Sequence, residues 1–460
     1  MLIRFSCKNF RSIGTDPLKF EMVSSSKIQA LPEHVCDSKD GVKILRNGVI
    51  YGGNASGKSS LIKAFLFLDV AVSGGGIPAG TSKEFCRAGA GHADEESTFD
   101  IQFSVEGKVF DYGFSCVLSR FAVTSEWLVD LNGSPKTLFS REGNKIEIGK
   151  QLKCRLSEDE RARMRIYSED FLGSDFGEHS LFLPFIGQGK AIAPDSPLQD
   201  LVKAFAWFGY GIDIMLPGQG PSKTEFYNDG STLDSVAEVL SSLDTGILSL
   251  KKTPVPFEDL EKRLPAALVV AVKDILRANL PKSAEDKFAM TLRNEDVFIG
   301  IERDGLGEPV ATTLEISHSG SSLTFDFGDE SDGTKRLFDF MDILFTKRRD
   351  TVFVVDELDR SLHPMLTAQI VKLFTDAHVD DQCQLVFTTH ENDIMTDELF
   401  RRDEIWFVDR SEDGTSVLYP LDSFNLRSDA RIGKQYLEGR YGGVPVLSTT
   451  RALSAIEGSR

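Results

Sequence analysis

The sequence has no paired cysteines and no long apolar run. Its six cysteines are scattered and never fall in a C-x-x-C pair, which argues against a zinc site and against a disulfide framework. No apolar stretch approaches the roughly 18 residues that a membrane-spanning helix needs. The N-terminus lacks an apolar core followed by a cleavage site, so it is not a signal peptide. We expect a cytoplasmic protein that has no membrane partner.

Positive charge is also scarce. There are 52 Lys and Arg residues against 70 Asp and Glu, a formal net charge of −18. A chain this acidic is not a general polyanion binder, because neutralising phosphates requires clustered Lys and Arg. Two local basic stretches, Lys251–Lys252 and Lys347–Arg349, remain. Each is either a solvated loop or a nucleic-acid contact.

The composition is otherwise that of a globular protein, with 41% apolar and 27% charged residues. At 460 residues the chain is either one large domain with an insertion or two domains. The sequence pattern predicts three segments: a first half of the core at 1–155, a helical insertion at 156–285 and a second half of the core at 286–460.

The first half begins with strand patterns. Alternation over the first dozen residues predicts an edge strand. A second strand, Ile44 to Tyr51, leads into a glycine-rich turn, and a helix is expected from about Lys58 to Val72. From Ser97 to about Ile148, alternating segments with a turn at Glu106–Gly107 predict an antiparallel subdomain.

The rest of the chain alternates helix and strand signals. Helical periodicity appears at Leu233 to Leu243 and at Phe257 to Leu276, and strand patterns return from Phe288 to Phe327. The apolar runs TVFVVDE (351–357) and QLVFTTH (384–390) are typical of buried parallel strands. We therefore expect an α/β fold whose mixed central sheet is interrupted in sequence by the insertion.

The glycine-rich turn matches the phosphate-binding pattern G-x-x-x-x-G-K-[ST] between a predicted strand and a predicted helix. Its glycines let successive backbone N–H groups point at phosphates, and the helix adds its positive N-terminal end. We expect Lys58 to contact the β- and γ-phosphates and the Ser59 hydroxyl to bind Mg²⁺. The expected phosphate contacts are Gly52, Asn54, Ala55, Ser56, Gly57, Lys58, Ser59 and Ser60.

Polar residues at two strand ends are further candidates for Mg²⁺ binding and hydrolysis. Asp356 follows the first apolar run and could hold the Mg²⁺ shell, while Glu357 could orient or deprotonate the attacking water. His390 follows the second run, where it could sense the γ-phosphate. Each feature alone is common at a strand end, but the order after a phosphate loop favours catalysis.

The segment ESDGTKR (330–336) lies about 20 residues ahead of the acidic strand. We expect Ser331, Asp332 and Gly333 to form a helix N-terminus whose free N–H groups suit a phosphate. By itself this pattern is equally well explained as an ordinary helix cap.

The order of these motifs resembles that of ABC-type ATPases of the SMC, RecF and overcoming-lysogenization group. The opening IRFSCKNFRSI and the tail RSDARIGKQYLEGRYGGVP are similar to a narrower bacterial family of ABC-like AAA ATPases from antiphage systems, such as the AbiL abortive-infection ATPase and the AriA subunit of PARIS. The resemblance covers both ends and the core, while residues 155–285 match only loosely.

This resemblance implies roles for further residues. Ser331, Asp332 and Gly333 would reach across a dimer to the γ-phosphate held by the other subunit. Residues 360–364 resemble the D-loop, with His363 where transport ATPases usually carry Asp. Asn9, Phe10 and Arg11 would lie beside the nucleotide. The glutamine loop has no clear counterpart, with Gln102 and Glu126 as weak candidates.

The resemblance also implies partners. Two subunits would sandwich two ATP molecules with Mg²⁺, giving a homodimer or a higher even-numbered oligomer that hydrolyses ATP slowly. About 70 residues follow His390, too few for the nuclease domain of overcoming-lysogenization proteins. We therefore expect the toxic chemistry of a defence system to reside in a separate effector encoded nearby, with nucleic acid or a phage protein as further candidate partners.

Three alternatives remain open from the sequence. The first is a RecF-like DNA-repair or DNA-clamp ATPase, although the acidic balance and the lack of long coiled-coil heptads count against it. The second is the energising subunit of a transporter, from which ESDGTKRL departs at the signature motif. The third is a nucleotide-binding scaffold that no longer hydrolyses, against which the presence of Glu357 argues.

Overall fold

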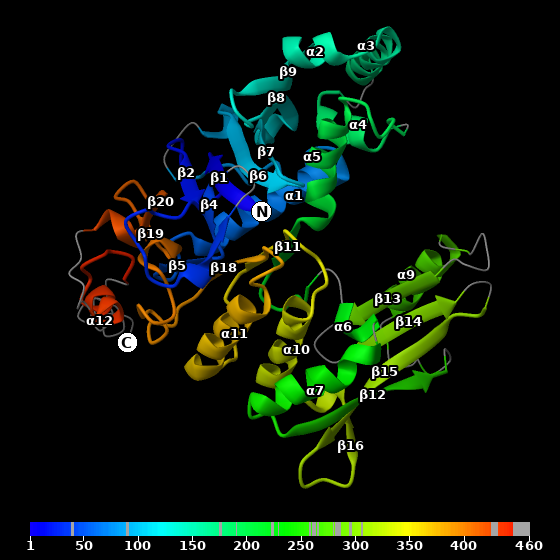
Figure 1. The fold of residues 1–460 in the computed structure, drawn as a ribbon, viewed down its shortest axis with the longest axis vertical. Coiled ribbons are helices and arrows are strands. Elements are labelled where there is room, and N and C mark those ends of the chain that lie inside the picture. The colour runs from blue at the N-terminus through cyan, green and yellow to red at the C-terminus, as the bar shows by residue number, and fades with distance from the viewer. Residues whose placement is uncertain are drawn as a thin grey trace, which may run out of the picture. The chain divides into compact units, whose positions relative to one another are not determined.

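The chain forms two compact units in the computed structural model (Figure 1). Unit 1 comprises residues 1–212, 350–356 and 382–460, and unit 2 comprises residues 213–349 and 357–381. The structure describes residues 1–37, 41–88, 92–173, 177–189, 191–221, 225–228, 230–256, 259, 264, 266–278, 280, 287–293, 297–304, 307–424 and 431–444. The predicted segment boundaries at 155 and 285 stay a prediction.

Unit 1 contains a mostly parallel sheet in the order β17-β18-β5-β19-β20. Strands β17, β18, β5 and β19 run parallel, and β20 pairs with β19 in the antiparallel sense. A sixth strand, β11 (Ile212–Met215), begins where the chain leaves unit 1. The bounds are β17 Val352–Val355, β18 Gln384–Thr388, β5 Asn47–Gly52, β19 Ile405–Arg410 and β20 Ser416–Pro420.

Every residue of β17, β18 and β5 is buried. This confirms the prediction that the two apolar runs are interior parallel strands. The single strand predicted over 44–51 is wrong, because the structure has β4 (Lys43–Leu45) and β5 as separate strands. β4 pairs with β3 (Val35–Asp37) in a small two-stranded sheet, so each strand has its own hydrogen-bonding partner.

Helix α1 (Lys58–Gly74) follows β5 and confirms the predicted helix. It ends at Gly75, whose φ of 87° favours glycine. Its aromatic side chains pack against a second sheet of unit 1. The ring centroids of Phe65 and Phe5 are 3.8 Å apart, and those of Phe67 and Phe99 are 4.5 Å apart. The helix that follows the glycine-rich turn is therefore anchored by buried aromatic area.

That second sheet has seven strands in the order β10-β9-β8-β7-β6-β1-β2. It confirms the predicted antiparallel subdomain, with the turn of the β6–β7 hairpin at Glu106–Gly107. The first strand is not the edge strand that was predicted, since β1 lies between β6 and β2. The bounds are β1 Leu2–Lys8, β2 Leu18–Glu21, β6 Ser97–Val105, β7 Lys108–Val117, β8 Ala122–Asp130, β9 Lys136–Glu142 and β10 Lys145–Ile148.

Unit 1 contains further helices besides α1. They are α2 Lys150–Arg155, α3 Glu158–Gly173, α4 Phe182–Gly187, α5 Gln199–Tyr210 and α12 Ile432–Leu437. Residues 427–430 and 445 of the tail motif lie outside the described residues. Within the described part of the chain, no helix combines the length and the hydrophobicity that crossing a membrane requires.

Unit 2 is built on an antiparallel sheet in the order β12-β15-β14-β13, with β16 paired to β15. The strand bounds are β12 Ile247–Val255, β13 Lys287–Arg293, β14 Phe298–Asp304, β15 Val310–His318 and β16 Thr324–Asp326. The helices are α6 Glu225–Asn228, α7 Leu233–Ser242, α9 Ala266–Ala278, α10 Asp332–Leu344 and α11 Pro364–Ala377.

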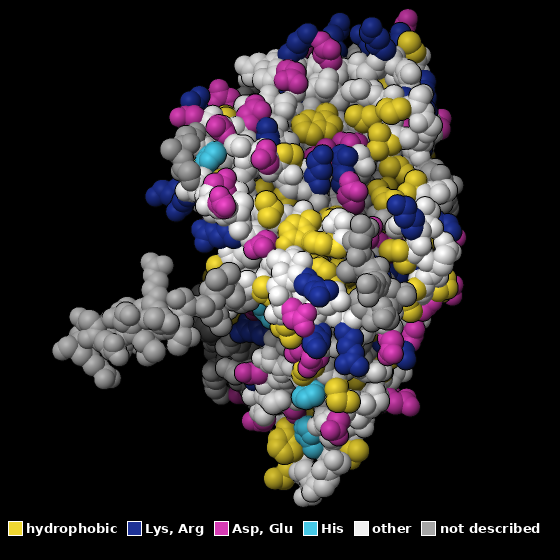
Figure 2. Space-filling view, turned by 90° about the vertical axis from the view of Figure 1, so that its left-hand side faces the viewer, with side chains coloured by type: hydrophobic (Ala, Val, Ile, Leu, Met, Phe, Trp, Pro, Cys, Tyr) yellow, Lys and Arg dark blue, Asp and Glu magenta, His cyan; other side chains and the backbone are white. Residues whose placement is uncertain are grey.

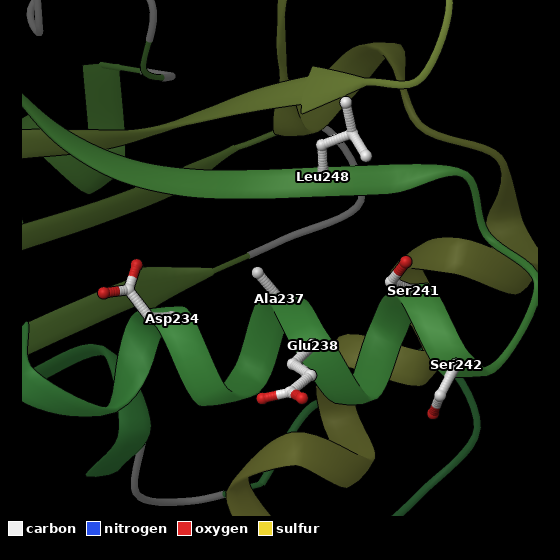
Figure 3. A pocket seen from close by; sticks show the side chains of 6 residues that line it. All are labelled: Asp234, Ala237, Glu238, Ser241, Ser242 and Leu248. Atoms are coloured by element: carbon white, nitrogen blue, oxygen red, sulfur yellow. The ribbon is translucent and has the colours of Figure 1, made fainter.

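The segment 156–285 therefore contains strands as well as helices. Helix α7 confirms the predicted 233–243 helix, and it lies along β12 with Ala237 on the side nearest the strand (Figure 3). Of the helix predicted over Phe257 to Leu276, the structure describes α9 (Ala266–Ala278). Most of 257–265 lies outside the described residues.

Candidate functional site

The glycine-rich turn connects the end of β5 to the start of α1, as the phosphate-loop pattern predicts. Ala55 and Gly57 adopt positive φ angles of 64° and 116°. A Cβ on Gly57 would overlap the Ser416 hydroxyl, and one on Gly52 would overlap the carbonyl oxygen of Val408. Close packing therefore requires glycine at both positions, and the backbone conformation requires it at Gly57 as well.

The side chains of the turn differ in exposure. Ser56 and Lys58 are buried, Ser59 and Ser60 are half-buried, and Asn54 and Ala55 are exposed. The Lys58 ammonium donates to the carbonyl oxygens of Gly52 (2.7 Å) and Gly53 (3.2 Å). A lysine held over the turn in this way can contact a phosphate seated there.

Serine hydroxyls connect the turn to two distant parts of unit 1. Ser12 donates to the Ser60 hydroxyl (2.8 Å), and Ser416 donates to Ser12 (2.8 Å) and to the main-chain oxygen of Ser56 (2.6 Å). These contacts join the N-terminal segment and β20 to the first turn of α1. Ser12 and Ser416 are not predictable from the sequence, because no local pattern marks them.

The N-terminal segment thus reaches the phosphate loop through Ser12. The Arg11 guanidinium forms an ion pair with Glu84 (2.7 Å). Asn9 is buried and donates to the main-chain oxygens of His92 and Glu95. Asn9 therefore holds the neighbouring loop, and Arg11 stays a proposed nucleotide contact.

The carboxyl ends of three adjacent parallel strands meet at one edge of the unit 1 sheet. β18 lies between β17 and β5, with Val355 opposite Phe387 and Thr388 opposite Ile50. Asp356 follows β17, the glycine-rich turn follows β5, and the exposed His390 follows β18. The strand order therefore brings three predicted groups to the same edge.

Asp356 is 1% exposed, and its Oδ1 accepts a hydrogen bond from the Thr388 hydroxyl at 2.6 Å. A buried carboxylate requires such a donor or a cation. Its oxygens and the Ser59 hydroxyl are hard ligands that suit Mg²⁺, which commonly takes only one or two protein ligands beside the substrate phosphates. Among the described residues, no cluster of three or more His, Cys, Asp or Glu groups could hold a metal by itself.

Replacing Thr388 with Val should disturb Asp356 while preserving side-chain shape. The lost donor leaves a buried carboxylate oxygen unsatisfied, so we expect a loss of about 1–3 kcal/mol in the free energy of unfolding. We also expect a several-fold higher Mg²⁺ concentration for half-maximal ATP turnover. Urea unfolding and Mg²⁺ titration of ATPase activity measure the two effects.

Thr375 provides the matched control, since its hydroxyl is also buried but donates to the Val371 main chain in α11. Thr375→Val should leave the Mg²⁺ requirement unchanged. An unchanged Mg²⁺ requirement in Thr388→Val would contradict the positioning role of Thr388.

In unit 2, the predicted helix cap is present. Ser331 is the N-cap of α10, and its Oγ accepts from the Thr334 N–H at 3.2 Å. Ser331 and Asp332 are exposed, and Gly333 is half-buried. A Cβ on Gly333 would lie 2.9 Å from the main-chain oxygen of Ser361. The predicted signature turn and D-loop are therefore neighbours.

The D-loop ends in a helix cap as well. His363 is the N-cap of α11, and its Nδ1 accepts from the Met365 N–H at 3.2 Å. A carboxylate oxygen can accept this bond too, which explains how His can stand where transport ATPases usually carry Asp.

Glu357 has an unusual backbone conformation for a residue with a side chain. Its φ is 53°, and its side chain is half-buried. Its main-chain oxygen accepts from the Arg336 guanidinium (3.3 Å) and from the Arg360 N–H (3.2 Å). Left-handed residues other than glycine are enriched at functional sites, where surrounding contacts hold them in place. The division between the two units falls between Asp356 and Glu357.

The two weak candidates for the glutamine loop have structural partners. Gln102 donates to Asp111 (2.8 Å). Glu126 is fully buried and accepts from the Phe182 and Leu183 N–H groups and from the Tyr112 hydroxyl. Burial raises the pKa of the Glu126 carboxyl, while these donors act in the opposite direction. Glu126 therefore ties α4 to β8.

The two basic stretches form ion pairs within the chain. Lys252 pairs with Glu302, Arg348 with Asp213 and Arg349 with Asp381. On the face shown in Figure 2, Lys and Arg side chains lie among Asp and Glu. These contacts provide no support for a nucleic-acid site at either stretch.

Known proteins share parts of this sequence and fold. A family model described as "AAA domain, putative AbiEii toxin, Type IV TA system" matches residues 49–175 and 210–396. No match was found among curated proteins. Similar solved structures include an Smc head bound to the C-terminal winged-helix domain of ScpA, at 15% identity over 91% of this chain and 97% of that chain with a TM-score of 0.40.

Two further solved structures are similar to this chain, with comparable sequence identities and TM-scores. The SMC head domain from Thermotoga maritima is 15% identical over 91% of this chain and 98% of that chain, with a TM-score of 0.35. The Smc head domain bound to the C-terminal domain of ScpA from Pyrococcus furiosus is 14% identical over 95% of this chain and 99% of that chain, with a TM-score of 0.40.

Proposed function

Because the chain belongs to the family of AAA domains described as putative AbiEii toxin, Type IV TA system, we propose that it binds ATP with Mg²⁺ and hydrolyses it slowly. The predicted fold class, an α/β P-loop NTPase of ABC type with a mixed central sheet and an antiparallel subdomain, is confirmed. The meeting of the phosphate loop and Asp356 at one sheet edge carries the proposal.

Each proposed role follows from the chemistry of the residue. The loop N–H groups and Lys58 hold the phosphates, and Ser59 and Asp356 hold Mg²⁺, which neutralises charge on the phosphates. Glu357 orients the attacking water and accepts its proton. His390 hydrogen bonds to the γ-phosphate and senses its presence.

We further propose that the catalytic site is completed in trans by a second copy. Ser331 and Gly333 form an exposed helix start whose N–H groups suit an incoming γ-phosphate. Two copies related by a two-fold axis would each receive this turn from the other, so the contact is isologous. ATP then stabilises the closed dimer, and hydrolysis releases it.

Mixing two inactive variants tests this arrangement. Lys58→Ala removes the phosphate-binding lysine, and Ser331→Arg blocks the signature turn. Each variant alone should lack ATPase activity. A 1:1 mixture should recover about a quarter of the wild-type rate, because half of the randomly formed dimers would contain one intact composite site.

Steady-state phosphate release measures this recovery. A mixture of Lys58→Ala with Glu357→Gln is the control. Each of these substitutions damages the phosphate-loop half of its own protomer's site, so both composite sites of a mixed dimer are defective and no intact site can form. If the first mixture is as inactive as its components, the trans arrangement is wrong.

The biological role we propose is that of a sensor and scaffold that controls a separate toxic effector in bacterial antiphage defence. The family description names a toxin system, and the chain termini resemble the AbiL and AriA ATPases. Co-expression with the products of neighbouring genes should yield a stable complex and toxicity only when both proteins are present. Equal toxicity of the effector alone, without complex formation, would exclude this role.

A further inference from the structure

A cavity of about 570 Å³ lies within unit 2 and is separate from the phosphate loop. One wall is a face of α10 formed by Asp332, Lys335, Arg336 and Asp339, whose spacing places them on the same side of a helix. Of the predicted signature residues, Asp332 lines the cavity and Ser331 and Gly333 do not, and Arg360 and Ser361 of the predicted D-loop line it as well. A volume of this size falls within the usual range of small-molecule sites, about 300–1,000 Å³.

The cavity has an excess of positive charge in a strongly acidic chain. Arg293, Lys335, Arg336 and Arg360 line it, against the two carboxylates of Asp332 and Asp339. The negative charge of Asp342 also raises the pKa of the Arg293 guanidinium. When Asp342 is counted with the two lining carboxylates, the four cations still outnumber the acids. An anion would therefore gain electrostatic energy on entering.

The buried Arg336 and the half-buried Arg293 share one carboxylate. Arg293 contacts Asp339 Oδ1 at 2.8 Å, and Arg336 contacts Asp339 Oδ2 at 3.1 Å. Burial lowers the pKa of the Arg293 guanidinium, and the adjacent Asp339 acts in the opposite direction. Asp339 therefore contacts both guanidinium groups, and Asp342 adds a second negative charge near Arg293.

Each of these arginines keeps a buried N–H group without an acceptor among the described residues. For Arg336 this is Nε, in a side chain that is 6% exposed, and for Arg293 it is Nη1. The Arg336 Nη2 donates to the main-chain oxygen of Glu357, and the Arg293 Nη2 donates to that of Lys335. Buried donors are normally satisfied, so these two groups beside the cavity are candidates for an acceptor that the described residues do not supply.

The opposite wall leaves space beside these donors. It is formed by the Gly218–Pro221 loop. A Cβ on Gly220 would lie 3.0 Å from Asp339 Oδ1 and 3.7 Å from Arg293 Nη1, and one on Gly218 would lie 3.4 Å from Arg360 Nη1. The Arg360 side chain is exposed and has no hydrogen-bond or ion-pair partner among the described residues. The glycine at position 218 leaves room beside the exposed Arg360 guanidinium.

We infer that this cavity binds a small phosphate-bearing ligand in each chain, at a place that includes no residue of the phosphate loop. Arginine forks match phosphate oxygens in geometry as well as in charge, and both unsatisfied donors belong to arginines. The shallow hollow between α7 and β12 provides a contrast (Figure 3). Its lining includes Asp234 and Glu238 and has no cation, so it offers nothing to an anion.

Pyrophosphate binding to the full-length Lys58→Ala protein tests the inference. This background weakens anion binding at the phosphate loop and leaves the cavity unchanged. Isothermal titration calorimetry should show about one pyrophosphate per chain, with an affinity independent of protein concentration because the site lies within one chain. Adding Arg360→Gln should weaken binding by about tenfold, through loss of a charge-assisted contact.

The matched control is Arg277→Gln, which removes an exposed arginine of α9 in the same unit. It should leave pyrophosphate affinity unchanged. Thermal unfolding should show equal Tm values for the Arg360 and Arg277 variants. Absent pyrophosphate binding in the Lys58→Ala background, or binding insensitive to Arg360→Gln, would overturn the inference. Equally tight citrate binding at the same site would overturn the assignment to phosphate.

These outcomes do not depend on the proposed ATPase. Pyrophosphate bound between two copies would become tighter as protein concentration rises, which the single-chain site does not. Loss of ATP turnover in Lys58→Ala would leave the cavity result intact, and failure of the cavity test would leave the ATPase proposal intact.

Discussion

Replacing Glu357 with Gln should lower ATP turnover by about two to three orders of magnitude, the range expected for loss of a general base. Glutamine keeps the size and hydrogen bonding of the side chain but cannot accept a proton from water. The φ of 53° is equally unfavourable for glutamate and for glutamine, so the substitution should leave the backbone conformation unchanged. ATP binding should remain, and the closed dimer should persist.

Single-turnover hydrolysis and size-exclusion chromatography with light scattering, each with and without ATP–Mg²⁺, measure the two effects. Glu398→Gln is the matched control, because Glu398 is an exposed glutamate after β18, and it should behave as wild type. Unchanged turnover in Glu357→Gln would show that Glu357 is not the base. A variant that stays monomeric in ATP would contradict nucleotide-dependent closure.

Replacing Lys58 with Ala should weaken ATP binding by about two orders of magnitude, since it removes charge-assisted contacts to the phosphates. The ammonium bridges the Gly52 and Gly53 carbonyls at 2.7 and 3.2 Å. Its loss should therefore also lower the free energy of unfolding by about 1 kcal/mol. Equilibrium binding of a fluorescent ATP analogue and urea unfolding measure the two effects.

Lys63→Ala provides the control on the same helix, because Lys63 lies in α1 beyond the turn that faces the phosphates. It should retain wild-type ATP affinity. If both variants bind ATP equally well, the glycine-rich turn does not hold the triphosphate.

Elements that depend on neighbouring residues could be predicted from the sequence. The strand before Gly52, the helix from Lys58 and the cap at Ser331 each arise from local periodicity and capping chemistry. The buried strand before Asp356 could be predicted too, since strands buried on both faces consist almost entirely of apolar residues.

The two wrong strand predictions concern segments whose pairing depends on strands distant in sequence. The first strand alternates as an edge strand would, yet β2 and β6 cover both its sides. Alternation reports which faces are buried, and it does not report how many neighbours a strand has. The 44–51 run contains two strands, because β3 pairs with its first part and β18 and β19 with its second.

The sequence by itself determined the chemical groups of the phosphate loop, the acidic strand end and the helix cap, because spacing within a few residues defines each of them. Only the tertiary structure showed the Ser12–Ser416 contact beside the loop, the Thr388 donor to Asp356, and the two arginines that share Asp339. These contacts join residues that no local pattern relates. They form because the strand order and packing of buried side chains bring those residues within hydrogen-bonding distance.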